Sequence, residues 1–406
     1  MEPATGRKQM KPFGALTPYH DALAIALELC PPIAETERLP LLQAGGRSVA
    51  ADVVAAADVP ASDRAAMDGY AVAAADLFGN DTVTLRPRGR VLAGELEDTA
   101  MQPGECWEVA TGARLPRGAD AVVPVEQTRA EGDAVVITAV LAAGDHVSRR
   151  GEDLQRGDVV LAAGAAVTPS AAAALASLGV AEIDVRRRPR VLLVPTGDEL
   201  VPLGEGLRPG QAYDSNSIAI ELLLRRNGAE VERTAILRDD PAALVDGLRA
   251  RHFDLVVTLG GTSVGRHDLV LDVVGSLGEV LVHGIAIKPG KPLLVARIDE
   301  TPLLGLPGFP TSCVFTGHTF AEPMVRRLGG LPLDHRRKGL AVLAETVRSP
   351  EGKLQFLTVA MDGESAVPVY RASSTITSMS RADGWIEIPA DTAELAAGTL
   401  VEVTFF

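Results

Sequence analysis

Residues 255–268 read LVVTLGGTSVGRHD, a short apolar run that leads directly into a glycine-rich segment. The run at 255–259 predicts a buried strand, because it is short, apolar and bounded by turn-forming residues. The segment after it contains Gly260, Gly261, Thr262, Ser263 and Gly265. Glycines let backbone N–H groups approach a phosphate closely, and the two hydroxyls add donors. A plain strand-to-helix turn would show the same glycines, so this loop alone leaves both interpretations open.

The alternation of strand, loop and helix continues on both sides of this segment. Apolar strands at 191–194 and 303–306 are separated by helical segments, of which one covers about residues 215–227. Such alternation is typical of a parallel sheet with helices on both faces. We therefore expect a doubly wound α/β domain over residues 187–331.

The regions on either side of this domain have a different pattern of apolar and turn-forming residues. Between residues 58 and 147, short apolar runs are separated by Gly, Pro and Asp every ten or so residues, which predicts a β-rich domain. Helical segments precede and follow it, so we expect it to be inserted into a discontinuous helical or mixed domain made of residues 16–57 and 148–186. Residues 332–406 return to short strands and predict a small, barrel-like β domain.

The overall composition limits the class of function. With 406 residues the chain is too long for a single core, so several domains are expected. The formal net charge of −14 argues against nucleic acid as a main partner. No apolar stretch is long enough to predict a membrane span. The three cysteines, Cys30, Cys106 and Cys313, form no CxxC motif, so a reducing cytoplasm fits better than a disulfide framework or a structural zinc site.

Acidic side chains follow several of the predicted strands. The carboxylates are Glu199, Asp239, Asp240 and Asp268. The carboxyl ends of parallel strands share one edge of the sheet, where ligands bind, so these groups are expected to converge there. Carboxylate oxygens with room for water suit Mg²⁺ bound to a phosphate. Aspartate also caps helices well, so capping is the competing role for one of the two adjacent aspartates.

A lysine turn is the second candidate site. The string KPGKP at 288–292 carries two ammonium groups three residues apart, which suits a small oxyanion. A polar turn between strands would look the same. The sequence contains no GxSxG motif and no HExxH-type spacing. The loops therefore favour phosphate or oxyanion chemistry that uses a metal and lysine, without a covalent enzyme intermediate.

Taken together, the loop strings resemble one family. They are AMDGYA at 66–71, ATGA at 110–113, RGED at 150–153, PTGDEL at 195–200, DSN at 214–216, RDDP at 238–241, the loop at 260–268, KPGKP at 288–292 and LPG at 306–308. Their order is that of the MoeA family of molybdopterin molybdenumtransferases, which includes the E domain of gephyrin. The set covers about residues 16–390, and the chain resembles that family over this whole length.

The resemblance implies an elongated homodimer of four-domain subunits. It implies that the α/β domain is of the pterin-binding type, with an active-site cleft that the partner subunit also lines. The implied reaction converts adenylylated molybdopterin and molybdate into molybdenum cofactor and AMP, with Mg²⁺ present. A molybdopterin-adenylyl donor protein and the apo-proteins of molybdoenzymes are the implied partners.

The loops predict some of the site residues, and the resemblance implies the others. The catalytic positions are Asp68, Thr111, Asp153, Glu199, Asp239 and Asp268. The molybdate-binding positions are Lys288, Lys291, Pro307, Pro310 and Ser312. The phosphate-binding positions are Gly260, Gly261, Thr262, Ser263, Gly265 and Ser373. The metal-binding carboxylates are Glu199, Asp239, Asp240 and Asp268.

The chain departs from the family pattern at five positions, Gly284, Phe309, Thr358, Ala372 and Asp383, where the family usually has Lys, Asn, Arg, Gly and Asn. Two of these changes remove positive charge, and one adds negative charge, in the region of the expected anion site. The alternative to the enzyme is therefore a non-catalytic molybdopterin carrier or scaffold. A generic nucleotide phosphohydrolase is a third hypothesis, which depends on the glycine loop alone.

Overall fold

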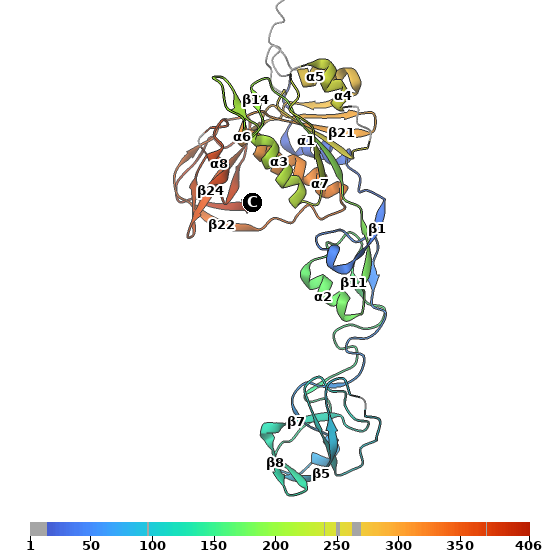
Figure 1. Ribbon diagram of the computed structural model, residues 1–406. Helices are drawn as coiled ribbons and strands as arrows, with labels where there is room; N and C mark the ends of the chain where they lie inside the picture. The colour runs from blue at the N-terminus through green and yellow to red at the C-terminus, as the bar shows by residue number, and fades with distance from the viewer. Residues whose placement is uncertain (1–13, 96, 239, 249–251, 262–268, 371) are drawn as a thin grey trace, which may run out of the picture.

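The computed structural model describes residues 14–406, with the exception of residues 96, 239, 249–251, 262–268 and 371. The molecule is elongated (Figure 1). A body at one end contains the α/β sheet and the C-terminal strands. A narrow arm with β1, β11 and α2 joins this body to a separate β-rich unit, which contains β5, β7 and β8. The predicted multidomain arrangement of α/β and β units is confirmed.

The body is built on a six-stranded sheet with the order β16-β13-β17-β21-β20-β18. Its strands are β13 (Arg190–Pro195), β16 (Glu230–Arg233), β17 (Leu255–Leu259), β18 (Glu279–His283), β20 (Leu294–Ile298) and β21 (Thr301–Leu306). The first four strands in that order run parallel, as predicted. The last two are antiparallel to their neighbours. For β20 the reason is the two-residue turn, with a positive φ of 51° at Asp299, that connects it to β21. Two residues suffice for a hairpin but not for a crossover.

Helices cover both faces of this sheet. They are α1 (Tyr19–Glu28), α3 (Ser215–Arg226), α4 (Pro241–Leu248), α5 (Leu269–Leu277), α6 (Pro310–Thr316), the π-helix η4 (Gly317–Ala321) and α7 (Glu322–Leu328). Successive side chains of a strand point to opposite faces. Accordingly, Val191 and Leu193 of β13 pack with α1, α3, α6 and α7, whereas Leu192 and Val194 pack with α4 and α5. The doubly wound α/β domain is therefore confirmed.

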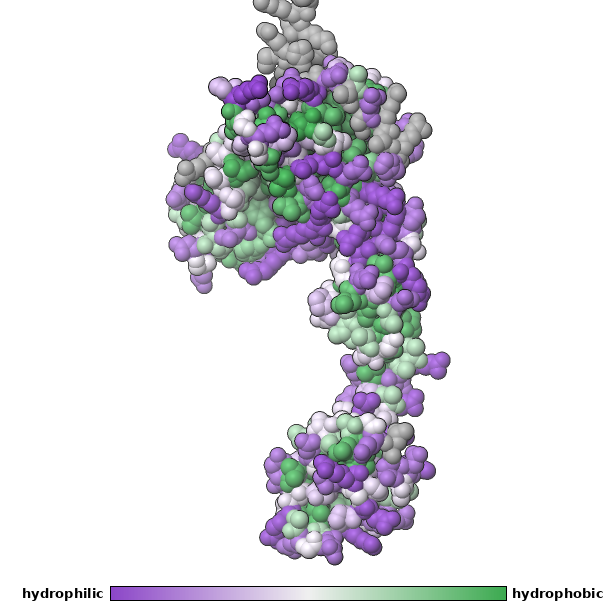
Figure 2. All heavy atoms as spheres, in the orientation of Figure 1, coloured by the Kyte–Doolittle hydropathy of each residue, from purple (hydrophilic) through white to green (hydrophobic). Residues whose placement is uncertain are grey.

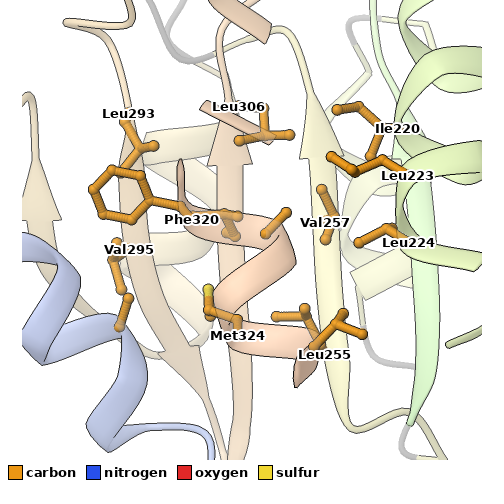
Figure 3. Packing of buried hydrophobic residues seen from close by; sticks show 14 of the residues in the cluster. Ile220, Leu223, Leu224, Leu255, Val257, Leu293, Val295, Leu306, Phe320 and Met324 are labelled. Atoms are coloured by element: carbon orange, nitrogen blue, oxygen red, sulfur yellow. The ribbon is translucent and has the colours of Figure 1, made fainter. Parts of the chain in front are cut away.

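The segment from α6 to α7 fills the first of these faces. Figure 3 shows Phe320 beside Leu293 and Val295 at the start of the neighbouring strand, with Ile220, Leu223 and Leu224 of α3 on the other side of the segment. Phe320 and Met324 are both fully buried. Gly317 lets this segment approach α3 closely, because a Cβ at this position would overlap the side chain of Ile220. Dense packing here fixes the loop that precedes α6, which lies at the carboxyl end of β21.

The arm and the distal unit come from one continuous excursion of the chain. In the arm, β1 (Thr36–Pro40) pairs with β12 (Glu182–Arg186), and β2 (Val53–Val54) pairs with β11 (Val159–Leu161). Helix α2 (Pro169–Ser177) begins after Thr168, whose Oγ accepts a hydrogen bond of 3.1 Å from Ala171 N. The distal sheet has the order β7-β4-β6-β5-β9-β8. Its strands are β4 (Gly69–Val72), β5 (Val83–Val91), β6 (Glu105–Val109), β7 (Ala121–Pro124), β8 (Thr128–Glu131) and β9 (Ala134–Ile137).

The C-terminal strands close into a five-stranded barrel in the order β24-β25-β22-β28-β26, which ends by pairing β26 with β24. They are β22 (Lys338–Leu343), β24 (Leu354–Asp362), β25 (Ser365–Pro368), β26 (Gly384–Ile388) and β28 (Leu400–Phe405). The two-residue strand β19 (Ile287–Lys288) pairs with β24 from outside the barrel. The remaining short elements are β3 (Arg64–Ala65), β10 (Val147–Ser148), β14 (Leu200–Val201), β15 (Ala212–Tyr213), β23 (Val347–Arg348), β27 (Glu394–Leu395), η1 (Leu41–Gln43), η2 (Ala74–Leu77), η3 (Val125–Gln127) and α8 (Thr377–Ser380).

A buried carboxylate joins the helical layer to the chain that enters the barrel. Glu322 of α7 lies 3.1 Å from His318 Nδ1 and 2.8 Å from His335 Nε2, and it forms an ion pair with Arg336. Burial favours the neutral form of Glu322, but the His318 bond and the Arg336 charge outweigh it and hold the pKa of Glu322 below its ordinary value. Burial lowers the pKa of His318, and the charges of Arg336 and Arg226 act in the same direction.

We expect the protein to lose stability as the pH falls below about 6.5, the ordinary pKa of histidine. In that range His318 takes up a proton in the unfolded chain before it does so in the folded protein, and lower pH then favours unfolding. Urea unfolding at about pH 7.5 and about pH 5.5 measures this loss. The loss should be smaller in His318→Gln than in the wild type or in the surface control His20→Gln. An equal loss in all three proteins would contradict the assignment.

Candidate functional site

A cavity of about 600 Å³ lies at the carboxyl ends of the parallel strands. The loops after β13, β17 and β21 line it on one side, and the lysine turn and the barrel line it on the other. This is the position where open α/β sheets bind ligands. Nine of the site residues that the sequence predicts lie either in the wall of this cavity or in the loops that form it. Those that line it directly are Glu199, Gly260, Gly261, Lys288, Lys291, Pro307, Ser312 and Ser373, and Pro310 begins the helix that carries Ser312.

The described part of the glycine loop packs tightly against the neighbouring strand end. Gly260 has a φ of +88°, and a Cβ at this position would lie 2.8 Å from the carbonyl oxygen of Thr196. A side chain there is excluded by both conformation and space, so the glycine is what brings the two strand ends together. The other three positions assigned to this loop, Thr262, Ser263 and Gly265, lie outside the described residues.

The lysine turn faces the cavity from the opposite side. Gly290 has a φ of +110°, and a Cβ there would overlap the side chain of Thr316 in α6. The turn therefore lies against α6, with both lysines lining the cavity. The Nζ of Lys288 is 5.6 Å from the centroid of the Tyr370 ring, so a barrel aromatic contacts this cation.

The start of α6 is tied to the barrel. Thr311 N donates a hydrogen bond of 3.1 Å to Ser373 O, and Thr311 Oγ donates to Thr375 O. These bonds keep the barrel loop that carries Ser373 at the cavity wall, where the Tyr370 hydroxyl lies 3.2 Å from Ser373 Oγ. Phe309, which precedes α6, also lines the cavity and is 63% exposed. It presents an apolar ring where the family usually has an amide.

The carboxylates divide into separate groups. Glu199 is exposed and lines the cavity. Asp240 is not among the lining residues, and its Oδ1 accepts a bond of 3.0 Å from Ala242 N at the start of α4, which is the capping role that competed with metal binding. Asp239 and Asp268 lie outside the described residues.

The implied Mg²⁺ would need oxygen ligands at this cavity. The described residues contain no group of three or more His, Cys, Asp or Glu side chains that could hold a metal ion. Mg²⁺, however, commonly binds through one or two carboxylates together with water and substrate phosphates. An exposed Glu199 carboxylate in the same cavity as the phosphate-type glycine loop fits that mode of binding.

Four further polar residues line the cavity without a role in the sequence assignment: Thr196, Asp214, Asn216 and Lys353. Lys353 lines it from the barrel, since Leu354 pairs with Ile287 and places the preceding lysine beside the lysine turn. Asn216 Nδ2 donates a bond of 2.8 Å to Gly308 O, and its Oδ1 is buried without a hydrogen-bond partner. Asn216 belongs to the DSN string, which is a signal in the sequence, whereas nothing in the sequence brings residue 353 next to residue 287.

Asp68, Thr111 and Asp153 lie in a different place. Asp68 Oδ1 accepts bonds of 2.7 Å from Thr111 N and 3.1 Å from Thr111 Oγ, and these bonds, the backbone one first, hold the pKa of Asp68 below its ordinary value. Thr111 and Asp153 line a second cavity of about 620 Å³. Asp68 directly precedes β4, which pairs with β7 at the far end of the molecule from β21 and α6 (Figure 1).

Comparisons with known proteins cover nearly the whole chain. Residues 17–179 match the MoeA N-terminal region (domain I and II), residues 193–327 match the model described as a probable molybdopterin binding domain, and residues 340–406 match the MoeA C-terminal region (domain IV). A protein of Mycobacterium tuberculosis named molybdopterin molybdenumtransferase 2 is 38% identical, with 95% of this chain and 98% of that protein covered. A protein of Haemophilus influenzae named molybdopterin molybdenumtransferase is 38% identical over 75% of this chain and 76% of its own length.

A solved structure gives the same result for the fold. The molybdopterin biosynthesis MoeA protein of Pyrococcus horikoshii superposes with a TM-score of 0.81 at 35% sequence identity. The match covers 96% of this chain and 99% of that one, so it includes the sheet, the arm, the distal unit and the barrel.

Proposed function

The chain belongs to the MoeA family of molybdopterin molybdenumtransferases, and from this membership we propose that it is a transferase that inserts molybdenum into molybdopterin. In the proposed reaction, adenylylated molybdopterin and molybdate give molybdenum cofactor and AMP, with Mg²⁺ as the metal. The observation that carries the proposal is the shared cavity, which brings the lysine turn, the glycine loop and Glu199 together.

Three ammonium groups make this cavity suitable for molybdate. The chain has six lysines, and three of them, Lys288, Lys291 and Lys353, line this one cavity. Molybdate is a doubly charged tetrahedral anion, and charge-assisted hydrogen bonds from ammonium groups are among the stronger interactions available to it. Ser312, which is almost fully buried, adds a hydroxyl at the same wall.

The opposite wall suits the adenylyl phosphate. The backbone N–H group of Gly261 can approach a phosphate closely, because this residue carries no side chain, whereas Gly260 N donates a bond of 3.0 Å to Leu306 O. Glu199, with Asp239 and Asp268 as the further proposed carboxylates, would hold Mg²⁺ here. The ion would supply charge stabilisation for the phosphate that leaves as AMP. The lysine side then holds the oxyanion near the pterin sulfurs that receive molybdenum.

The departures from the family pattern leave the cavity cationic. Gly284 has a φ of +85°, a conformation that a lysine side chain would strain, so the missing cation has a backbone reason. Lys353 supplies an ammonium group to the same cavity. Asp383 does not line the cavity; its Oδ2 accepts a bond of 2.7 Å from Met361 N within the barrel. Thr358 is fully buried in β24. These observations favour the enzyme over a non-catalytic carrier or scaffold.

A homodimer would bring the two separated sets of residues together. Asp68, Thr111 and Asp153 lie at the end of an arm, far from the cavity of their own chain (Figure 1). We propose that they complete the cavity of a partner subunit. Figure 2 shows apolar side chains gathered on the body in the region of α3. Ile218 and Leu222 of this helix are 36% and 64% exposed. Exposed apolar surface of this kind is typical of contact between proteins.

The proposed partners follow from the reaction. A molybdopterin-adenylyl donor protein would supply the substrate, and apo-molybdoenzymes would receive the product, without nucleic acid. None of the helices in the described part of the chain is both long and apolar enough to cross a bilayer. Cys30, Cys106 and Cys313 are all buried free thiols, which suits the reducing cytoplasm that we propose as the location.

Incubation of the protein with adenylylated molybdopterin, Mg²⁺ and molybdate tests the function directly. We expect release of AMP that depends on molybdate, because the anion must be bound before molybdenum can be transferred. Chromatography of the nucleotide product measures it. Tight binding of the pterin without release of AMP would instead identify a carrier, and release of phosphate from unrelated nucleotides would identify a phosphohydrolase.

Lys353→Ala should raise the molybdate concentration needed for half-maximal rate by about tenfold, the effect of losing one charge-assisted contact of about 1.4 kcal/mol. The KM for adenylylated molybdopterin should change little, because the glycine loop and Glu199, which are proposed to bind the adenylyl phosphate and its metal, are unchanged. The matched control is Lys338→Ala, a barrel lysine that pairs with Glu402 at the surface and does not line the cavity. Equal molybdate dependence in the two variants would remove Lys353 from the site.

Mixed dimers test whether subunits share the active site. Asp68→Asn and Glu199→Gln homodimers should both be inactive. A heterodimer with one change in each subunit should regain about half of the wild-type activity, because one of its two composite cavities then contains both native carboxylates.

The control heterodimer carries both changes in one subunit and none in the other. If the two subunits share each active site, each cavity of this heterodimer contains one substituted carboxylate, so the heterodimer should be inactive. Activity in this control, together with none in the first heterodimer, would mean that each chain forms its site alone.

A further inference from the structure

A separate cavity of about 210 Å³ lies where α3, η4 and α7 meet the chain that enters the barrel. It shares no lining residue with the cavity at the sheet edge. Its charged and polar lining includes Arg226, Arg326, Arg336, Arg337, His318 and Glu322. Four guanidinium groups around one small cavity are unexpected in a chain whose net charge is −14.

The carboxylate in this cavity is already paired with cationic and histidine side chains. Glu322 is the one carboxylate side chain among its described lining residues, and it is bound to Arg336 and to two histidines. Arg326 donates 2.8 and 3.1 Å bonds to Pro332 O and Asn227 Oδ1, which are both uncharged.

The other two guanidinium groups are exposed. Arg337 lies over the Phe405 ring at 4.6 Å, and neither it nor Arg226 has an ion pair with any described residue. Among the described lining side chains, the positive charges therefore exceed the negative charges.

This excess has an energetic consequence. Burial lowers the pKa of Arg336, and the charge of Arg226 lowers it further. Burial and the charge of Arg336 likewise lower the pKa of Arg326. Burial is the larger cause in both groups, and Glu322 opposes it. An anion bound between the guanidinium groups would add favourable interactions with these partly desolvated cations. The guanidinium group matches the geometry of tetrahedral oxyanions, to which it donates paired hydrogen bonds.

We propose that this cavity binds a small tetrahedral oxyanion of the phosphate, sulfate or molybdate class, held by the guanidinium groups of Arg226, Arg326 and Arg337. The volume agrees with this class. It equals that of about seven water molecules at roughly 30 Å³ each. That leaves room for one such anion with a few waters, and it lies below the lower limit of about 300 Å³ for pockets that enclose drug-sized ligands.

Such an anion would connect three parts of the structure. Arg226 ends α3, Arg326 lies in α7, and Arg337 belongs to the segment that enters the barrel. The barrel in turn supplies Lys353 and Ser373 to the catalytic cavity. Anion binding at the junction therefore stabilises the position of the barrel against the sheet. The site does not depend on the proposed reaction, because its residues are absent from the catalytic cavity.

Equilibrium dialysis of the full-length protein with labelled inorganic phosphate tests the proposal. The measurement uses Lys288→Ala/Lys291→Ala as the background, so that the lysine turn does not contribute. We expect one phosphate per chain in this background, and binding at least about tenfold weaker when Arg226→Gln and Arg337→Gln are added. Both arginines are exposed at the surface, so these changes should leave the fold intact.

The control adds Arg348→Gln to the same background, because Arg348 is 89% exposed and pairs with an exposed glutamate elsewhere on the barrel. It should bind phosphate as the background does. Competition with sulfate and with molybdate identifies which oxyanion the site prefers. As a second readout, phosphate should raise the Tm of the background protein but not that of the double arginine variant. Absence of stoichiometric phosphate binding, or binding unaffected by the two arginine changes, would overturn the proposal.

Discussion

The catalytic cavity depends on a pairing of only two residues. Ile287 and Lys288 of β19 pair in parallel with Leu354 and Gln355 at the start of β24, which joins the lysine turn of the α/β unit to the wall of the barrel. Thr311 adds bonds from the start of α6 to the barrel loop at residues 373–375. Without these contacts the sheet edge would be an open surface. With them it becomes a cavity with walls on two sides, in which interactions between charges are stronger than at an open surface.

Local features were predictable from the sequence because their causes are local. A buried strand at 255–259 and the Thr168 cap of α2 depend on a few adjacent residues. The convergence of the loops follows from the rule that parallel strands share their carboxyl edge. The antiparallel edge of the sheet was not predicted, since it depends on a two-residue turn at Asp299 that no strong turn dipeptide marks. Lys353 was missed for a different reason: its position follows from the pairing of strands 67 residues apart, which no periodicity records.

The distribution of charge shows why net charge says little about a binding site. The chain has 53 acidic and 39 basic side chains, yet half of its lysines line one cavity, and four arginines surround another. Packing helps to keep each cluster together, in addition to the attraction of Glu322 for Arg336 and of the Tyr370 ring for Lys288. Gly290 fits against α6, and the aromatic rings of Trp385 and Phe405 lie against Arg336 and Arg337. The fold thus provides the free energy that opposes repulsion between like charges, and anions can recover part of it on binding.

The elongated shape has a physical cost that only assembly would offset. The arm consists of two short strand pairs and one helix with a small core, so the distal unit is carried by little buried surface. A fold selected only for the stability of one chain would gain by packing the distal unit on the body, since buried apolar area contributes about 25 cal/mol per Å². The distal unit instead keeps Asp68 and Thr111 in a preformed hydrogen-bonded arrangement away from its own body. Preorganised polar groups at the end of an extended arm are positioned for a second molecule, and the body of an identical chain, with its open cavity and the exposed apolar side chains of α3, has the surface to receive them.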